Sequence, residues 1–116
     1  MNDQAVVIFV TVPTIEVGKQ IARTLVEKRL AACVNIIPTI HSIYTWEGQM
    51  EENEEALLLI KSRRELFETE LIPAVRTLHP YELPEIIALP VQMGLPAYLK
   101  WIEQATAGSD DCLKKS

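Results

Sequence analysis

Apolar and polar residues recur along this chain with periods that predict seven secondary-structure elements. Residues 5–12 are apolar nearly throughout, which is typical of a central strand buried on both faces. Val17, Ile21 and Leu25 recur at helical spacing behind Thr14, a residue suited to the N-cap. The same reasoning predicts four strands, at residues 5–12, 33–46, 51–61 and 85–91. It also predicts three helices, at residues 15–30, at residues 62–78 with Ser62 as the N-cap, and at residues 96–106.

The longest predicted feature is a β-hairpin over residues 33–61, with a glycine-containing turn at 47–49. At ~3.3 Å per residue, an arm of about 13 residues spans roughly 43 Å, whereas a domain of this size has a diameter of about 35 Å. The tip should therefore leave its own domain and expose Ile43, Tyr44 and Trp46, which is an aggregation hazard unless a partner covers them. We expect that partner to be another copy of the chain, with the functional site where subunits meet.

The segment after the hairpin is predicted to be a helix with an irregularity. Ser62-Arg63-Arg64-Glu65 matches the capping-box pattern, and its two arginines are expected to be solvated at the helix start. Pro73 removes a backbone donor, so we expect a kink or break there.

The element order predicts an α+β fold of the ferredoxin-like βαββαβ type, with a four-stranded antiparallel sheet, an extended hairpin and an extra C-terminal helix. Two helices cover only one sheet face, so the other face again requires a partner subunit. We expect a single domain over residues 1–106 and a disordered tail over 107–116.

Composition narrows the function classes. The chain has 116 residues, a net charge of −5 and a pI near 5.0, which argues against a nucleic-acid partner. It contains no apolar stretch long enough for a membrane span and begins without a basic leader, so we expect a cytoplasmic protein. Cys33 and Cys112 are expected to be free thiols. No phosphate loop, HExxH motif or nucleophile elbow is present, so we expect no enzyme, although a hydrolase using His79 and a carboxylate is a third, weaker alternative.

Five segments of the chain stand in a characteristic order: Leu30-Ala31-Ala32-Cys33-Val34-Asn35, Ser42-Ile43-Tyr44-Thr45-Trp46-Glu47-Gly48, Leu58-Leu59-Ile60-Lys61, His79-Pro80-Tyr81-Glu82-Leu83-Pro84-Glu85-Ile86-Ile87-Ala88-Leu89-Pro90 and Tyr98-Leu99-Lys100-Trp101. This series strongly resembles the CutA family of divalent-cation tolerance proteins. The resemblance implies a PII-like homotrimer of ferredoxin-like subunits whose hairpins pair between neighbours, and it implies binding of copper or other divalent ions.

Metal ligands are few in this chain. Some family members have extra cysteines near the first helix and near the His-Pro-Tyr segment, but no cysteine stands at either place here. The candidates are Cys33, which supplies a soft thiolate or packs as a small hydrophobe, and His79, which binds metal or caps its helix. The acidic run at 51–55 attracts divalent cations or is a solvated strand edge.

A cleft between subunits is the candidate ligand site. Its expected lining is Lys61, His79, Tyr81 and Glu85. Lys61 follows four apolar residues, so its amine requires a counterion such as Glu82 or Glu85, or an anionic ligand.

Two functions remain as alternatives. The first is a cytoplasmic homotrimer in divalent metal tolerance, binding copper or another divalent cation weakly. The second is a PII-like signalling or scaffold trimer that binds a small anionic ligand or a protein partner in its clefts. Tyr44, Trp46 and Trp101 are the expected trimer-interface residues in either case, because aromatic side chains are enriched in subunit contacts.

Overall fold

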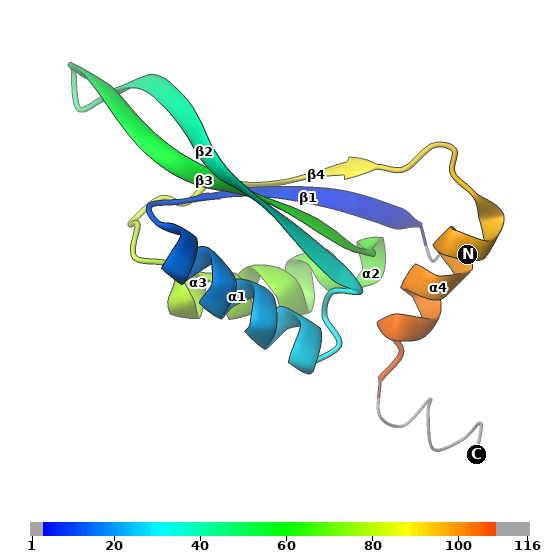
Figure 1. The fold of residues 1–116 in the computed structure, drawn as a ribbon. Helices are drawn as coiled ribbons and strands as arrows, with labels where there is room; N and C mark the ends of the chain where they lie inside the picture. Colours follow the sequence, from blue (N-terminus) through cyan, green and yellow to red (C-terminus); the bar gives the residue numbers. More distant parts are fainter. Residues whose placement is uncertain (1–3, 109–116) are drawn as a thin grey trace.

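Four strands form one antiparallel sheet in the order β2-β3-β1-β4 (Figure 1). The computed structural model describes residues 4–108. Its elements are β1 (Ala5–Val12), α1 (Ile15–Glu27), β2 (Cys33–Trp46), β3 (Gln49–Arg63), α2 (Arg64–Leu66), the π-helix η1 (Phe67–Leu71), α3 (Ile72–Leu78), β4 (Ile86–Pro90) and α4 (Pro96–Ala105). This order and topology confirm the predicted ferredoxin-like α+β fold with its long hairpin and additional C-terminal helix.

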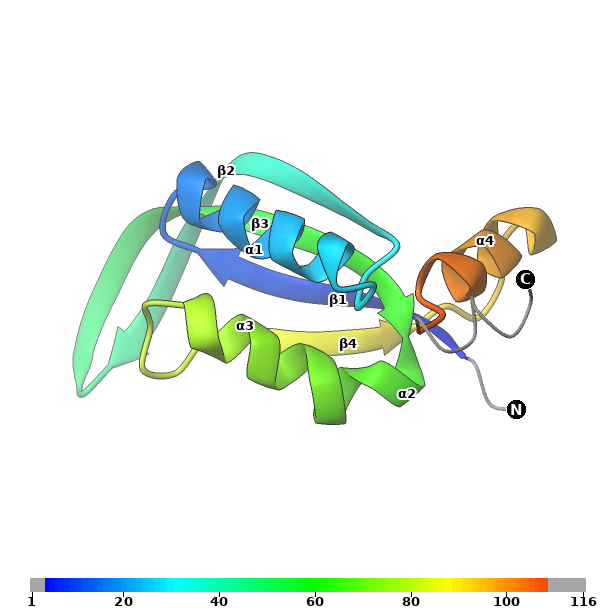
Figure 2. The same ribbon diagram turned by 90° about the horizontal axis from the view of Figure 1, so that it is seen from below.

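Helices cover one face of the sheet. Figure 2 shows α1 and the α2–η1–α3 segment lying side by side across that face, while α4 lies beyond the end of the sheet opposite the hairpin tip. The core forms between the helices and the sheet, and no residue in it is more than 5% exposed. It contains Val6, Ile8, Val10, Val12, Ile21, Leu25, Ala31, Ala56, Leu58, Ile60, Leu71 and Val75.

The opposite face of the sheet is uncovered in the single chain. Successive strand residues point to opposite faces, so the residues alternating with the core positions share this face. The ladder aligns Phe9 with Leu59 and Ile87, and Val7 with Leu89. Ile87 and Leu89 are each 51% exposed. The single chain thus leaves one sheet face uncovered, as predicted, and burial of β1 on both faces by a partner subunit stays a prediction. We call the surface of Val7, Phe9, Leu57, Leu59, Ile87 and Leu89 the open face.

The hairpin arm extends well beyond the body. The β1–β3 ladder ends at Val12 and Ala56, and beyond it residues 40–55 pair only with one another. The molecule measures 54 × 28 × 23 Å, which confirms that the arm leaves its domain. Pro38 and Thr39 fall in a register shift between Ile37 and Ile40, a bulge at the sheet edge where a proline is tolerated.

The turn at the arm tip occupies two residues. Glu47 and Gly48 both have positive φ, at 52° and 81°, which suits the right-handed twist of a two-residue hairpin loop. β2 therefore ends at Trp46 as predicted, whereas β3 is longer than the predicted three-residue turn allows. β3 begins at Gln49 and not at residue 51.

The first helix begins as predicted and ends early. The Thr14 hydroxyl accepts a hydrogen bond from the Val17 amide, which confirms the N-cap. The helix ends at Glu27 and not at residue 30, because Arg29 takes a φ of 61° and leaves the helical conformation.

The predicted capping box at Ser62 was wrong. Ser62 is a fully buried residue of β3, and its hydroxyl donates to the Leu30 carbonyl at 2.6 Å. The helix begins only at Arg64, and no side chain caps it. The four residues from Ser62 to Glu65 match the capping-box sequence, but the serine hydroxyl donates to a carbonyl that lies 32 residues away in the sequence.

Pro73 coincides with the expected irregularity. Five residues upstream form a π-helix, and the Ile72 amide donates to the Phe67 carbonyl. A π-turn adds a residue to the helical path, and Pro73 lies in the first turn of α3, where its missing N–H matters least.

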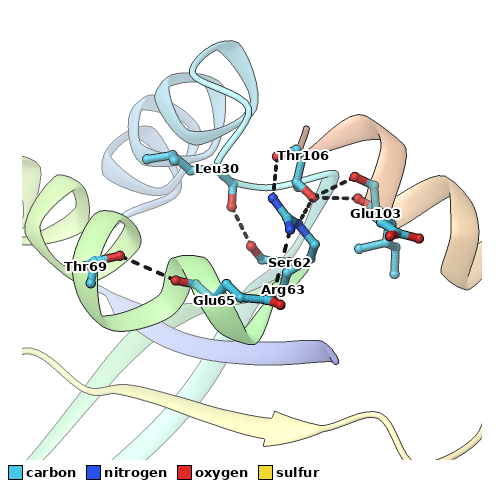
Figure 3. Close-up of polar contacts among 8 residues, drawn as sticks. Leu30, Ser62, Arg63, Glu65, Thr69, Glu103 and Thr106 are labelled. Carbon is cyan, nitrogen blue, oxygen red and sulfur yellow. Dashed lines mark hydrogen bonds and ion pairs between the residues drawn. The ribbon is translucent and has the colours of Figure 1, made fainter. Parts of the chain in front are cut away.

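Arg63 attaches α4 to the body (Figure 3). Its Nε donates to the Thr106 hydroxyl at 2.8 Å and its Nη2 to the Thr106 carbonyl at 2.9 Å. The Thr106 hydroxyl in turn donates to the Ile102 carbonyl at 2.7 Å. A cation at the C-terminus of a helix is favourable because it interacts with the free carbonyls there. The expectation of a solvated Arg63 was therefore wrong.

The predicted boundary at residue 106 falls next to this contact. Ala107 is 9% exposed and its carbonyl accepts from Arg29, so it packs with the body. Residues 109–116 lie outside the described part of the chain, and Cys112 lies among them.

Candidate functional site

A cavity of about 760 Å³ lies between the hairpin arm and the loop that joins α3 to β4. The arm supplies Ser42, Ile43, Tyr44, Trp46 and Glu55, the loop supplies Pro80, Tyr81, Glu82, Leu83 and Glu85, and β1 supplies Thr11. The volume is in the range of small-molecule sites. All of these residues belong to one chain, and the placement of the cleft between subunits stays a prediction.

Glu55 and Tyr81 form the polar contact that links the two walls of the cavity. The Tyr81 hydroxyl donates to Oε2 of Glu55 at 2.8 Å, and Glu55 is only 7% exposed. Partial burial raises the pKa of Tyr81 far above its usual 10, and the hydrogen bond to Glu55 raises it further. Tyr81 therefore remains a neutral hydrogen-bond donor at physiological pH.

His79 has a structural position beside the cavity. Its Nε2 lies 2.7 Å from the Thr11 carbonyl, and its Nδ1 accepts from the Tyr81 amide at 3.2 Å. The carbonyl can only accept, so Nε2 carries the proton and Nδ1 supplies the lone pair. Both nitrogens are engaged, which leaves none for a metal ion. This geometry fits the capping alternative: His79 ties the end of α3 to β1 and orients Tyr81, whose ring lies 4.8 Å away.

Lys61 lies away from this cavity. It pairs with Val7 on β1, four residues before Thr11, which corresponds to about 13 Å along the strand. Its ammonium donates to the Asn35 side-chain oxygen. No ion pair with Glu82 or Glu85 forms among the described residues, so the predicted counterions do not serve Lys61.

Cys33 is opposite Lys61 in the β2–β3 ladder. It is a free, half-buried thiol at the start of its strand. Within residues 4–108 no group of three or more His, Cys, Asp or Glu side chains is arranged to hold a metal ion. The residues of a single chain therefore do not fit a closed metal centre.

The three predicted interface aromatics lie at two ends of the molecule. Tyr44 and Trp46 are 44% and 40% exposed on the arm, and Tyr44 donates to Asn53 at 2.7 Å. Trp101 is 43% exposed on α4, where its ring lies 5.4 Å from that of Tyr98. Figure 1 shows α4 at the end of the body opposite the arm. Exposed aromatic surface therefore occurs at both ends of one chain.

Tyr81 and Glu85, two of the predicted lining residues, both line this cavity, and so do two carboxylates that were not predicted there, Glu55 and Glu82. Glu55 was expected only as part of an acidic run, and Glu82 only as a counterion of Lys61. The signal was present, because Glu55 is the last acidic residue before the apolar block at 56–60, where the arm joins the sheet. A carboxylate at such a junction is expected to be partly buried.

Known proteins share this fold and much of this sequence. Residues 6–105 match the family described as CutA1 divalent ion tolerance protein. The chain is 54% identical over 102 residues to "Protein CutA" of Mus musculus, covering 84% of this chain and 55% of that protein. It is 49% identical over 100 residues to "Divalent-cation tolerance protein CutA" of Thermus thermophilus, covering 86% and 96%. The chain thus spans little more than half of its mammalian relatives.

Solved structures agree with the fold. The divalent cation tolerance protein Cut A1 from Thermus thermophilus superposes with a TM-score of 0.86 at 48% identity, covering 89% of this chain and 99% of that one. CutA1 from Oryza sativa gives a TM-score of 0.87 at 42% identity, covering 93% and 98%.

Proposed function

Because this chain belongs to the CutA1 divalent ion tolerance family, we propose that it serves in tolerance of divalent metal ions, as a homotrimer that binds copper or another divalent cation weakly. It acts by binding and not by catalysis. The names of its relatives, which are divalent-cation tolerance proteins, support the tolerance role.

The open face is the observation that carries the proposal of an assembly. Ile87 and Leu89 are half exposed on an apolar sheet face. A large exposed apolar surface promotes aggregation unless another protein surface covers it. The arm adds Ile43 at 65% and Met50 at 78% exposure. The open face and the arm are different surfaces, so contacts between them are heterologous and close into a ring. Three copies form that ring in our proposal.

The metal ions are proposed to be cargo at the surface of the arm and not a resident centre. His41 and Glu54 are directly opposite in the β2–β3 ladder, where Cβ atoms are about 4.5–5.5 Å apart, and both side chains are exposed. Imidazole and carboxylate together suit Cu(II). Two protein ligands make a weak site, and the neighbouring Glu52 adds negative charge. Cys33 is a poorer candidate because its ladder partner is the cation Lys61.

Calorimetric titration of the tag-free full chain with copper chloride tests the metal part of the proposal. We expect weak, saturable uptake that decreases in the His41→Ala variant. Glu70→Gln on η1, which removes a carboxylate remote from the arm, is the matched control and should bind as the wild type does. No uptake by the wild type would refute metal binding, and an unchanged isotherm for His41→Ala would refute the assigned position.

We propose that the protein works in the cytoplasm. Within the described residues no helix is long and apolar enough to cross a membrane. Relatives are named as a chloroplastic protein of Arabidopsis thaliana and a periplasmic protein of Archaeoglobus fulgidus, so the fold itself is used in several compartments. Fractionation of the native host, with immunodetection of the chain, tests this proposal: a membrane or periplasmic pool would contradict it.

Ligand sensing is the second candidate function, and the cavity favours it. The predicted anionic ligand does not suit this cavity. Three carboxylates line it, from Glu55, Glu82 and Glu85, and its lining contains no lysine, arginine or histidine among the described residues. A like-charged ligand would be repelled.

A further inference from the structure

The cavity combines aromatic and acidic walls. Tyr44 and Trp46 approach it from the arm, and Tyr81 approaches it from the loop. The faces of aromatic rings carry partial negative charge and attract cations, most strongly when water is excluded. Carboxylates contribute the remaining charged groups of the lining, so both kinds of wall favour positive charge.

Glu55 is the most informative member of this lining. At 7% exposure it is more than nine-tenths buried, and its only side-chain hydrogen bond from the described residues goes to Oε2. The donor is the neutral phenol of Tyr81, so no cation of the described residues compensates the carboxylate. Burying a carboxylate without a counter-charge is costly. Its other oxygen, Oε1, remains open to a donor in the cavity.

Tyr81 fixes that carboxylate in place. Because its pKa is raised, its hydroxyl stays protonated and donates to Glu55. His79 accepts a hydrogen bond from the Tyr81 amide, and this bond orients the loop. The site is thus preorganised, with Oε1 as its unused acceptor.

The geometry points to a small organic ammonium ion as the ligand of this cavity. About 760 Å³ is far larger than a metal ion, and the described residues hold no cluster of metal ligands. An ammonium group donates to Glu55 Oε1, while the apolar body of the ligand contacts Trp46 and Tyr44. This inference goes beyond metal tolerance and does not depend on it.

Three isosteric probes test the charge requirement. Benzylammonium, benzyl alcohol and benzoate share a shape and differ in charge. By calorimetry on the assembled full chain, we expect benzylammonium to bind at least about tenfold more tightly than benzyl alcohol, since charge-assisted contacts of this kind contribute that much. Benzoate should not bind. Equal affinities for the three probes would overturn the inference, and so would a cavity that binds none of them because a neighbouring subunit fills it.

Substitutions test the assignment of Glu55. Glu55→Gln keeps the shape and the acceptor for Tyr81 but removes the charge, so affinity for benzylammonium should fall about tenfold while that for benzyl alcohol is unchanged. Glu68→Gln, on the exposed surface of η1, is the control. Glu85→Gln alters an exposed wall residue and should weaken benzylammonium binding even if Glu55→Gln fails to fold. Unchanged affinity in both cavity variants would refute the site.

Discussion

Replacing Ile87 by lysine tests whether a neighbouring subunit covers the open face. Ile87 projects from β4 at 51% exposure, in line with Phe9 and Leu59. In the single chain a lysine there is solvated, so the monomer fold should tolerate it. In the proposed trimer the same position is covered by a neighbouring subunit.

The magnitude follows from the exposed fraction. Complete burial of an isoleucine side chain contributes about 1.5–3 kcal/mol, so the half still exposed is worth about 1 kcal/mol per subunit on assembly. Moving an unpaired ammonium into an apolar contact costs several kcal/mol more. The total of at least about 4 kcal/mol per subunit corresponds to roughly a thousandfold weaker association.

Size-exclusion chromatography with light scattering is the assay. We expect Ile87→Lys to elute as a folded single chain at concentrations where the wild type is assembled. Val26→Lys is the matched control, because Val26 is 44% exposed on α1, away from the open face. Ile87→Thr separates strand propensity from burial and should weaken assembly only modestly. An Ile87→Lys protein that assembles as the wild type does would refute the role of the open face.

Three further predictions concern the arm, the loop and the core. Met50→Ala truncates an arm side chain that is 78% exposed and does not line the cavity, so it should weaken assembly; sedimentation at low micromolar concentration checks this, and an intact trimer would disprove the contact. Tyr81 ionises above pH 10 in the unfolded chain but stays protonated in the folded one, so the folded state binds more protons there and stability must fall as the pH rises. One proton limits the slope attributable to Tyr81 to about 1.4 kcal/mol per pH unit, and the observed slope should be smaller because the residue is 37% exposed. Urea denaturation from pH 9 to 11 should show a shallower decline for Tyr81→Phe. Ser62→Ala leaves the Leu30 carbonyl without its donor and should lower the free energy of unfolding by about 1–3 kcal/mol, whereas an unchanged midpoint in denaturant would show that water replaces the hydroxyl.

Features specified by periodicity were predictable from the sequence. β1 has the predicted limits of residues 5 and 12, and the overhang of the arm followed from its length alone. Features that depend on distant partners were not predictable. Ser62 resembled a helix cap, but its hydroxyl bonds a carbonyl 32 residues away. For His79 the sequence left a metal ligand and a helix cap as alternatives, and its bonding partner Thr11, 68 residues earlier, could not be identified from the sequence.

The set of residues that line the cavity was also not predictable from the sequence. Lys61 and Tyr81 were both expected in the cleft lining. The ladder register separates them, because Lys61 pairs with Val7 while the cavity lies at the Thr11 end of β1. Register is a three-dimensional property that one sequence specifies only weakly, so the separation of these two residues was not predictable.

In the proposed assembly, copies of this chain cover the open face and the arm of one another. Native mass spectrometry of the unmodified chain, diluted to submicromolar concentration, detects that assembly. We expect one species of about 39 kDa, three times the 13.1 kDa of the single chain. A stable 13.1 kDa species with a native-like spectrum and no larger assembly at any concentration would contradict it.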